Sequence, residues 1–180
     1  MRIRNLAVTA LVPAMMLAGC GNEASSIAAS SPGAQKASKQ TLTEQVGAPV
    51  ASADPVVNAY YDYRVALDQM MRSGGAKTEQ LRPVMTANLF QSISVQAKYY
   101  RSKRLRNTGA TTVLWAKRTL ASNGVIVTAC YDTSAARTVD SSNQSVLPAD
   151  IPTRWLDQMR VKQQNTRWIV DGGSTKPTDC

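Results

Sequence analysis

The sequence predicts the α+β class, with N-terminal helices packed in a curved, mostly antiparallel sheet. Two observations carry this prediction. Apolar residues recur at helical spacing from residue 55 to about residue 105, and after Gly109 the pattern changes to β-branched and aromatic runs separated by turn signals. Helices that precede strands are typical of an α+β layout, whereas a parallel sheet needs helices and strands in alternation.

The first expected element is a helix from Asp54 to about Arg72. Asp54 and Pro55 form a typical N-cap and first-turn pair. The stretch 73–77, with the sequence SGGAK, ends the helix. Apolar residues at spacings of four and three share one helix face, which we expect to be buried: Val56, Tyr60, Tyr63, Leu67 and Met70.

A second helical region extends from Thr78 to about Leu105, with a break near Pro83. The strands follow it. The pair Asn123-Gly124 predicts a tight hairpin turn, and the last two strands join around Asn165-Thr166. Residues 141–152 read as a loop, and the expected strands cover residues 111–120, 124–132, 136–140, 153–164 and 166–173.

Residues 1–19 have the pattern of a secretory signal peptide. Arg2 and Arg4 supply a positive start, and an apolar run from Leu6 to Met16 follows. This run of about 11 residues is too short for a transmembrane helix, which needs roughly 20. Its end, Leu17-Ala18-Gly19-Cys20, resembles the bacterial lipobox.

The lipobox resemblance implies that Cys20 is the lipidation site. In that family the cysteine thiol becomes a diacylglyceryl thioether, and a dedicated peptidase cleaves just before it. Cys20 would then be the first residue of the mature chain and would hold it to membrane lipid through its acyl chains. The expected location is the extracytoplasmic face of a cell membrane, as a lipid-anchored protein.

Residues 20–53 are expected to form a flexible tether. They are rich in Ala, Ser, Gly, Gln and Pro and contain no aromatic residue, so they cannot bury enough apolar surface to offset the entropy of ordering. A flexible chain of this length spans about 30 Å on average. The remaining residues, 54–180, are enough for one domain with a single core.

Cys130 and Cys180 are the two cysteines left after lipidation of Cys20. An even number of thiols in an oxidising compartment suggests a disulfide bridge, and two thiols allow one connectivity. The alternatives are two unpaired, partly buried thiols or a metal site. We expect no metal site, because the sequence has no histidine and no CxxC motif.

The formal net charge is +9, and about +7 remains without the signal peptide. Residues 98–106 carry the densest positive charge, with tyrosines between the cations. The cluster is either a solvated helix end that complements the helix dipole or an anion-binding surface. The expected extracytoplasmic location argues against nucleic acid as a partner of this cluster. The anion-binding candidates are Lys98, Arg101, Lys103, Arg104 and Arg106.

The helices followed by a sheet closing on RWIV resemble the nuclear-transport-factor-2-like (SnoaL-like) cone. More narrowly, residues 127–146 and 167–180 resemble a group of actinobacterial and phage-associated lipoproteins. The resemblance implies a cone fold for residues 54–180 and pairing of Cys130 with Cys180. It implies no catalytic residue. Aromatic residues that could line a ligand pocket inside such a cone are Tyr60, Tyr63 and Trp115.

Enzymatic activity is not expected. The absence of histidine excludes Ser-His-Asp and Cys-His catalysis, and no phosphate-binding, dinucleotide-binding or GxSxG motif is present, so we expect no cofactor. Cone folds also host isomerases that pair an Asp base with a Tyr donor. Candidates for that chemistry would be Asp62 or Asp132, with Tyr60, Tyr61, Tyr63, Tyr99 or Tyr131.

The sequence thus predicts a membrane-anchored, extracytoplasmic lipoprotein that acts as a non-catalytic binding or interaction module in the cell envelope. The expected partner is an envelope protein or a small apolar ligand. An exposed apolar patch would favour the protein, and a cavity lined by Tyr and Trp would favour the ligand. Two alternatives are a phage-encoded surface lipoprotein in superinfection exclusion and a small-molecule isomerase.

Overall fold

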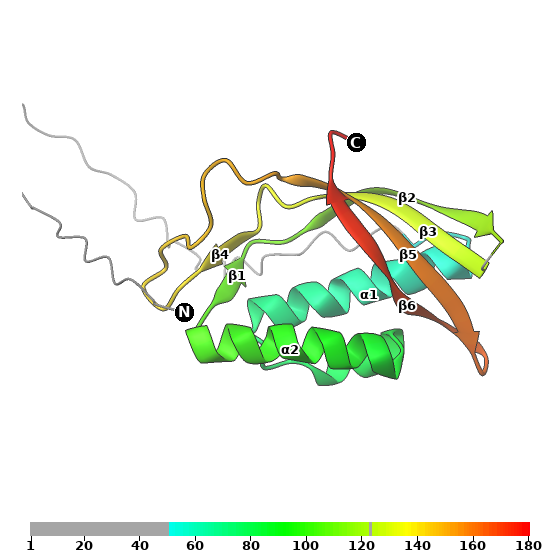
Figure 1. Ribbon diagram of the computed structural model, residues 1–180, viewed down its shortest axis with the longest axis horizontal. Helices are drawn as coiled ribbons and strands as arrows, with labels where there is room; N and C mark the ends of the chain where they lie inside the picture. Colours follow the sequence, from blue (N-terminus) through cyan, green and yellow to red (C-terminus); the bar gives the residue numbers. More distant parts are fainter. Residues whose placement is uncertain (1–50, 123) are drawn as a thin grey trace, which may run out of the picture. The chain divides into compact units, whose positions relative to one another are not determined.

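The computed structural model describes residues 51–122 and 124–180. The predicted signal peptide, Cys20 and all but the last few residues of the tether lie outside the described residues. The helices are α1 (Pro55–Arg72), the 3-10 helix η1 (Glu79–Val84) and α2 (Ala87–Lys103). The strands are β1 (Arg106–Thr108), β2 (Thr112–Ala121), β3 (Gly124–Asp132), β4 (Arg137–Val139), β5 (Arg154–Gln164) and β6 (Arg167–Pro177) (Figure 1).

Helix α1 begins as the sequence predicts. The Asp54 carboxylate accepts a hydrogen bond of 2.9 Å from the backbone N–H of Val56, and Pro55 lies in the first turn. All five apolar residues of the predicted face are buried. Each such side chain stabilises the fold by roughly 1.5–3 kcal/mol through its removal from water. The predicted face of α1 is therefore confirmed as the centre of the core.

Four strands form one antiparallel sheet in the order β2-β3-β5-β6. Helix α1 packs against one face of this sheet, and α2 lies beside α1 and contacts β6 (Figure 1). We call the sheet face that α1 covers the inner face. Its buried residues join the α1 face in one hydrophobic cluster and include Val127, Ala129, Met159, Val161 and Val170.

Strands β1 and β4 form a separate two-stranded antiparallel ribbon, in which Asn107 pairs with Thr138. Gly109, with a φ of 71°, follows β1. A Cβ atom there would overlap the backbone of Ala135, so only glycine lets the two chain segments approach this closely. The ribbon lies beside the four-stranded sheet and does not continue it (Figure 1).

The predicted fold class, an α+β cone of the nuclear-transport-factor-2-like type, is wrong. The described residues form mostly antiparallel β-structure, divided between two sheets with six strands, with few helices. The predicted strand at 136–140 was expected to extend one curved sheet. Instead, its residues Arg137–Val139 pair with Arg106–Thr108, a stretch that was expected to follow and stop the second helical region.

Cys130 and Cys180 form a disulfide bond, with 2.07 Å between the two Sγ atoms. This confirms the expected pairing. Cys130 lies in β3 and is fully buried, and Cys180 follows β6. The bond ties the segment after β6 to the middle of the sheet and closes a loop with a sequence separation of 50 residues.

Candidate functional site

A pocket of about 750 Å³ opens between the helices and the segment that follows β3. Its walls come from α1, α2, the β1–β4 ribbon, the stretches 133–138 and 145–153, and single residues of β3, β5 and β6. Ligand-binding pockets typically have volumes of roughly 300–1,000 Å³. The pocket is therefore large enough for a small organic molecule.

The pocket wall is both aromatic and polar. Among the described residues that line it, the charged side chains are Arg64 and Arg137, and none is acidic. The aromatic ones are Tyr63, Tyr100, Tyr131 and Trp155. The hydroxyl and amide side chains of the wall are those of Gln96, Asn107, Thr111, Thr133, Ser134, Thr138, Ser145, Thr153 and Thr175.

Arg64 forms one end of the pocket. It projects from α1 and is only 8% exposed. Its guanidinium Nη1 lies 3.6 Å from Oδ2 of Asp157 in β5, and its Cζ lies 3.8 Å from the ring centroid of Tyr131 in β3. Burial lowers the pKa of Arg64, but the neighbouring tyrosines and Asp157 outweigh this effect and raise it. A positive charge is therefore held at the base of the pocket.

Asp157 is 1% exposed and has two hydroxyl partners besides Arg64. Tyr60 donates a hydrogen bond of 2.8 Å to its Oδ2, and Thr175 donates one of 2.5 Å to its Oδ1. Burial raises the pKa of Tyr60 above its usual range and that of Tyr63 to about 12, although the Arg64 charge opposes both shifts. Both phenols therefore stay protonated at neutral pH.

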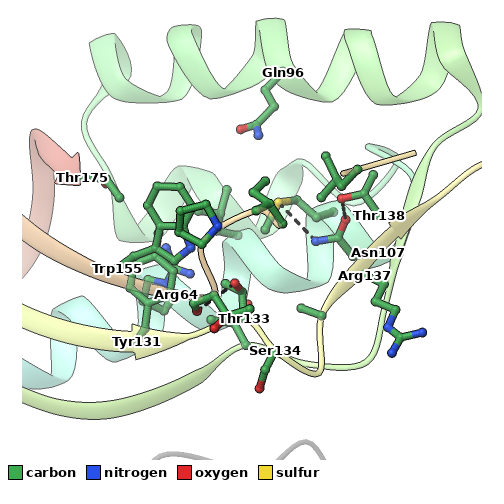
Figure 2. A pocket seen from close by; sticks show the side chains of 18 of the residues that line it. Arg64, Gln96, Asn107, Tyr131, Thr133, Ser134, Arg137, Thr138, Trp155 and Thr175 are labelled. Atoms are coloured by element: carbon green, nitrogen blue, oxygen red, sulfur yellow. Dashed lines mark hydrogen bonds between the residues drawn. The ribbon is translucent and has the colours of Figure 1, made fainter. Parts of the chain in front are cut away.

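A second polar cluster lies at the ribbon. Asn107 and Thr138 are neighbours in β1 and β4, and the Thr138 hydroxyl donates a hydrogen bond of 2.9 Å to Oδ1 of Asn107. Tyr100 of α2 donates to the same oxygen at 3.1 Å. Figure 2 shows Asn107, Thr138 and Arg137 on one side of the pocket, and Arg64 with Tyr131 and Trp155 on the other.

The three predicted pocket residues occupy different places. Tyr63 lines the pocket, while Tyr60 is fully buried behind the wall and binds Asp157. Trp115 does not belong to the lining. It pairs with Cys130 across β2 and β3, so both side chains point away from α1, on the outer face of the sheet. The three residues therefore do not form one site.

The two aspartates considered for isomerase chemistry do not line the pocket. Asp62 is exposed on α1. Asp132 pairs with Arg154 at 3.7 Å, and the backbone N–H of Ser134 lowers the pKa of its carboxyl. A general base must come within hydrogen-bond reach of the proton it removes, and neither aspartate lies in the pocket wall.

The predicted anion-binding residues gather at the end of α2 and the start of β1. All five are exposed, and none lines the pocket. Arg101 donates a hydrogen bond to the backbone oxygen of Gly75, and Arg106 donates one of 2.5 Å to the side chain of Asn143. Two of the five cationic side chains, both of them arginines, are thus engaged in holding neighbouring turns.

Arg64, Asp157 and Arg137 were not predicted as site residues. A signal for the first two was present. Arg64 follows Tyr60 by four residues and therefore falls within the buried stripe of α1. Asp157 occupies an inward position of β5, between Trp155 and Met159. A charge inside an apolar pattern needs a partner, and each of these two is the partner of the other.

No helix within residues 51–122 and 124–180 has the length and apolar character needed to span a membrane. Across those same residues, there is also no group of three or more histidine, cysteine or acidic side chains arranged to hold a metal ion.

No protein-family model and no curated protein matches the chain. Among solved structures, the fold is similar to the intermembrane space region of the chloroplast protein ARC6, with a TM-score of 0.51. The two sequences are 16% identical, and the match covers 72% of this chain and 100% of that one. A de novo β-sheet design protein, whose solution structure is known, matches with a TM-score of 0.39 and 12% identity, over 69% of this chain and 91% of that one. At such identities the first likeness concerns the fold alone, and nothing is drawn from the second.

Proposed function

We propose that the protein is a lipid-anchored extracytoplasmic lipoprotein whose domain binds a small molecule without chemical turnover. The observation that supports this function most strongly is the pocket of about 750 Å³. Four aromatic side chains and many hydroxyl groups converge in it. Ligand sites typically combine apolar surface with a few well-placed polar groups.

The membrane anchor in this proposal rests on the N-terminal sequence. A positive start, a short apolar run and a lipobox-like end at Cys20 together imply lipidation. The disulfide between Cys130 and Cys180 supports the same address, because such bonds persist in oxidising compartments outside the cytoplasm. The role in superinfection exclusion remains a prediction from the resemblance alone.

The burial and the hydrogen bonds of the Asp157 carboxylate favour binding without catalysis. Asp157 contacts the lining residues Arg64 and Thr175, yet it is 1% exposed and accepts hydrogen bonds from two hydroxyls. A general base must come within hydrogen-bond reach of the proton it removes. Asp157 is instead placed to hold Arg64 and Tyr60.

The exposed apolar residues favour a ligand over a protein partner. Val146, Leu147 and Ile151 lie in the stretch between β4 and β5, and the latter two line the pocket. The others, Val95, Tyr99, Leu114 and Leu120, are distributed over α2 and β2. Three of the seven large apolar side chains that are exposed in the described part of the chain thus lie in one stretch, and two of these three line the pocket.

Native mass spectrometry of the full-length chain, purified from the membranes of a producing bacterium, tests this proposal. We expect a small-molecule adduct on the wild type. Ala149→Trp should remove the adduct, because Ala149 lines the pocket and an indole there would fill its mouth. Ser142→Trp is the matched control, since Ser142 is exposed in the same stretch and does not line the pocket.

Two results would refute small-molecule binding in this pocket. One is a wild-type chain with no adduct under conditions that preserve the fold. The other is an adduct that persists unchanged in Ala149→Trp.

A further inference from the structure

Arg64 and Asp157 differ in how fully their hydrogen-bonding groups are used. The Asp157 carboxylate accepts from Tyr60 and Thr175. The Arg64 guanidinium lies 3.6 Å from that carboxylate, beyond the usual N–H···O range of about 2.7–3.2 Å. Its Nε is buried and has no hydrogen-bond partner in the part of the chain that the structure describes. The charge of Arg64 is therefore balanced, while part of its donor capacity is unused.

Arg64 belongs to the pocket wall. Arg64 is 8% exposed and is one of the residues that line the pocket. Buried N–H groups without acceptors are costly, so proteins rarely keep them without a purpose. The five N–H groups of a guanidinium lie in one plane, and pairs of them match the two oxygens of a carboxylate.

The charge balance of the pocket favours a singly charged anion. The charged residues of the described wall are Arg64 and Arg137, and Asp157 behind the wall neutralises one of these charges. One positive charge remains in excess, that of the exposed Arg137, which lies across the pocket from Arg64 (Figure 2). A cation would be repelled, and an anion with two charges would leave one of them unbalanced in a partly buried site.

The surroundings of Arg64 are aromatic. Tyr131 and Trp155 are paired neighbours on β3 and β5, and the guanidinium lies over the Tyr131 ring at 3.8 Å. Figure 2 shows Trp155 and Tyr131 next to Arg64 on the same side of the pocket. These two rings offer apolar surface for the body of a ligand whose charged group reaches Arg64.

We infer that the ligand is a small monocarboxylate with an aromatic or aliphatic body, bound with its carboxylate on Arg64 and its body against Tyr131 and Trp155. This inference rests on the proposed function, and it narrows the ligand from any small molecule to one chemical class. The shape of the guanidinium fork distinguishes this class from neutral amides, and the single excess charge distinguishes it from phosphonates.

Isothermal titration of the full-length chain with three probes of one shape tests the inference. The probes are 3-phenylpropionate, its amide and 2-phenylethylphosphonate. We expect the carboxylate to bind about tenfold or more tightly than the amide, the usual effect of one charge-assisted hydrogen-bonded pair. The phosphonate, titrated at a pH above its second pKa so that it carries two charges, should bind more weakly than the carboxylate.

Variants locate the carboxylate. Arg64→Lys keeps the charge but loses the planar fork, so carboxylate binding should weaken about tenfold while amide binding changes little. Arg160→Lys is the matched control on an exposed residue outside the pocket. Because a change at Arg64 can impair folding, Arg137→Gln provides a second test at an exposed lining residue, with an expected loss of about threefold for the carboxylate.

Equal affinity for amide and carboxylate would overturn the inference while leaving small-molecule binding intact. So would tighter binding of the phosphonate, or unchanged carboxylate binding in both Arg64→Lys and Arg137→Gln. If no probe binds but the wild-type chain retains its adduct in native mass spectrometry, the carboxylate assignment fails and the proposed function stands. If the adduct is also absent, the proposed function fails with it.

Discussion

Arg64 of α1 and Asp157 of β5 form an ion pair across the core, with 3.6 Å between Nη1 and Oδ2. The pair couples the main helix to the sheet at the base of the pocket. It also determines the chemistry of the wall, because it fixes a positive charge beside Tyr131 and Trp155. Its environment differs from that of the surface ion pairs, since both side chains are almost fully buried.

Asp157→Asn is expected to destabilise the domain strongly. Removal of one partner leaves the buried Arg64 charge uncompensated, which typically costs about 3–5 kcal/mol. The measurement is the free energy of unfolding in urea at neutral pH. Glu79→Gln is the matched control, because it makes the same chemical change in the exposed pair with Arg82. The control should lose less than about 1 kcal/mol of unfolding free energy. Equal losses in both variants would show that the Arg64–Asp157 pair does not stabilise the fold more than a surface pair does.

The disulfide is expected to contribute stability through the loop it closes. With a sequence separation of 50 residues between Cys130 and Cys180, the chain-entropy relation gives at most about 4 kcal/mol. Urea unfolding with and without reductant measures the difference. Mass spectrometry without reductant should find both thiols blocked to alkylation; ready alkylation of the unreduced chain would contradict the bond.

The domain should lose stability above about pH 10 through Tyr63. Burial raises the pKa of this phenol to about 12, against a usual value of about 10 in an unfolded chain. The protonated form is therefore favoured by folding. Its contribution is fully present below pH 10 and is lost as pH rises toward 12, at about 1.4 kcal/mol per pH unit.

The comparison of wild type with Tyr63→Phe isolates this contribution. The variant has no phenol to ionise at this position, so its unfolding free energy should fall less steeply between about pH 10 and 12. Other titrating groups affect both chains alike. Parallel pH profiles for the two proteins would show that Tyr63 ionises equally in the folded and unfolded states.

Cys20→Ala is expected to release the protein from the membrane. Without the thiol, no diacylglyceryl thioether can form, and one apolar run of about 11 residues is too short to remain as a membrane span. Fractionation of cells and labelling with a radioactive fatty acid measure the effect. Ser26→Ala, a change of similar size in the tether region, should leave both unchanged. Retention of Cys20→Ala in the membrane fraction would argue against lipid anchoring.

Local patterns predicted the elements well. The face of α1 was predictable because its apolar spacing and its N-cap at Asp54 lie within one continuous stretch. The strands β2, β3, β5 and β6 were predictable for the same reason, from β-branched runs and from turns such as the one at Asn165, whose φ is 56°. Such signals act over a few residues and need no knowledge of distant partners.

The arrangement of the elements could not be predicted in the same way. Strand β4 lies within the strand expected at 136–140, but β1 has three residues and was not expected. The two strands lie about 30 residues apart, which is too far for a hairpin signal to predict their pairing. The sheet face on which Trp115 lies could not be predicted either. An irregularity between Val113 and Trp115 shifts the alternation, so Trp115 points to the outer face although Val113 packs against the core.

The pocket could not be predicted from the sequence, because its wall is formed by many separate segments. Gln96 lies on α2, Asn107 on the ribbon, and Thr175 on β6. The stretch 145–153 adds several lining residues but reads in the sequence only as a loop. Only the buried pair of Arg64 and Asp157 had a local signature, as charges at positions that the patterns require to be apolar.

The most direct measurement is a fragment screen by heteronuclear NMR on the isotope-labelled full-length chain. Chemical-shift changes identify the residues that a bound fragment approaches. We predict changes that cluster on pocket residues such as Gln96, Ser134 and Trp155. Changes confined to the outer sheet face around Trp115 and Thr128, or no specific changes from any fragment, would contradict the assignment of the pocket as the binding site.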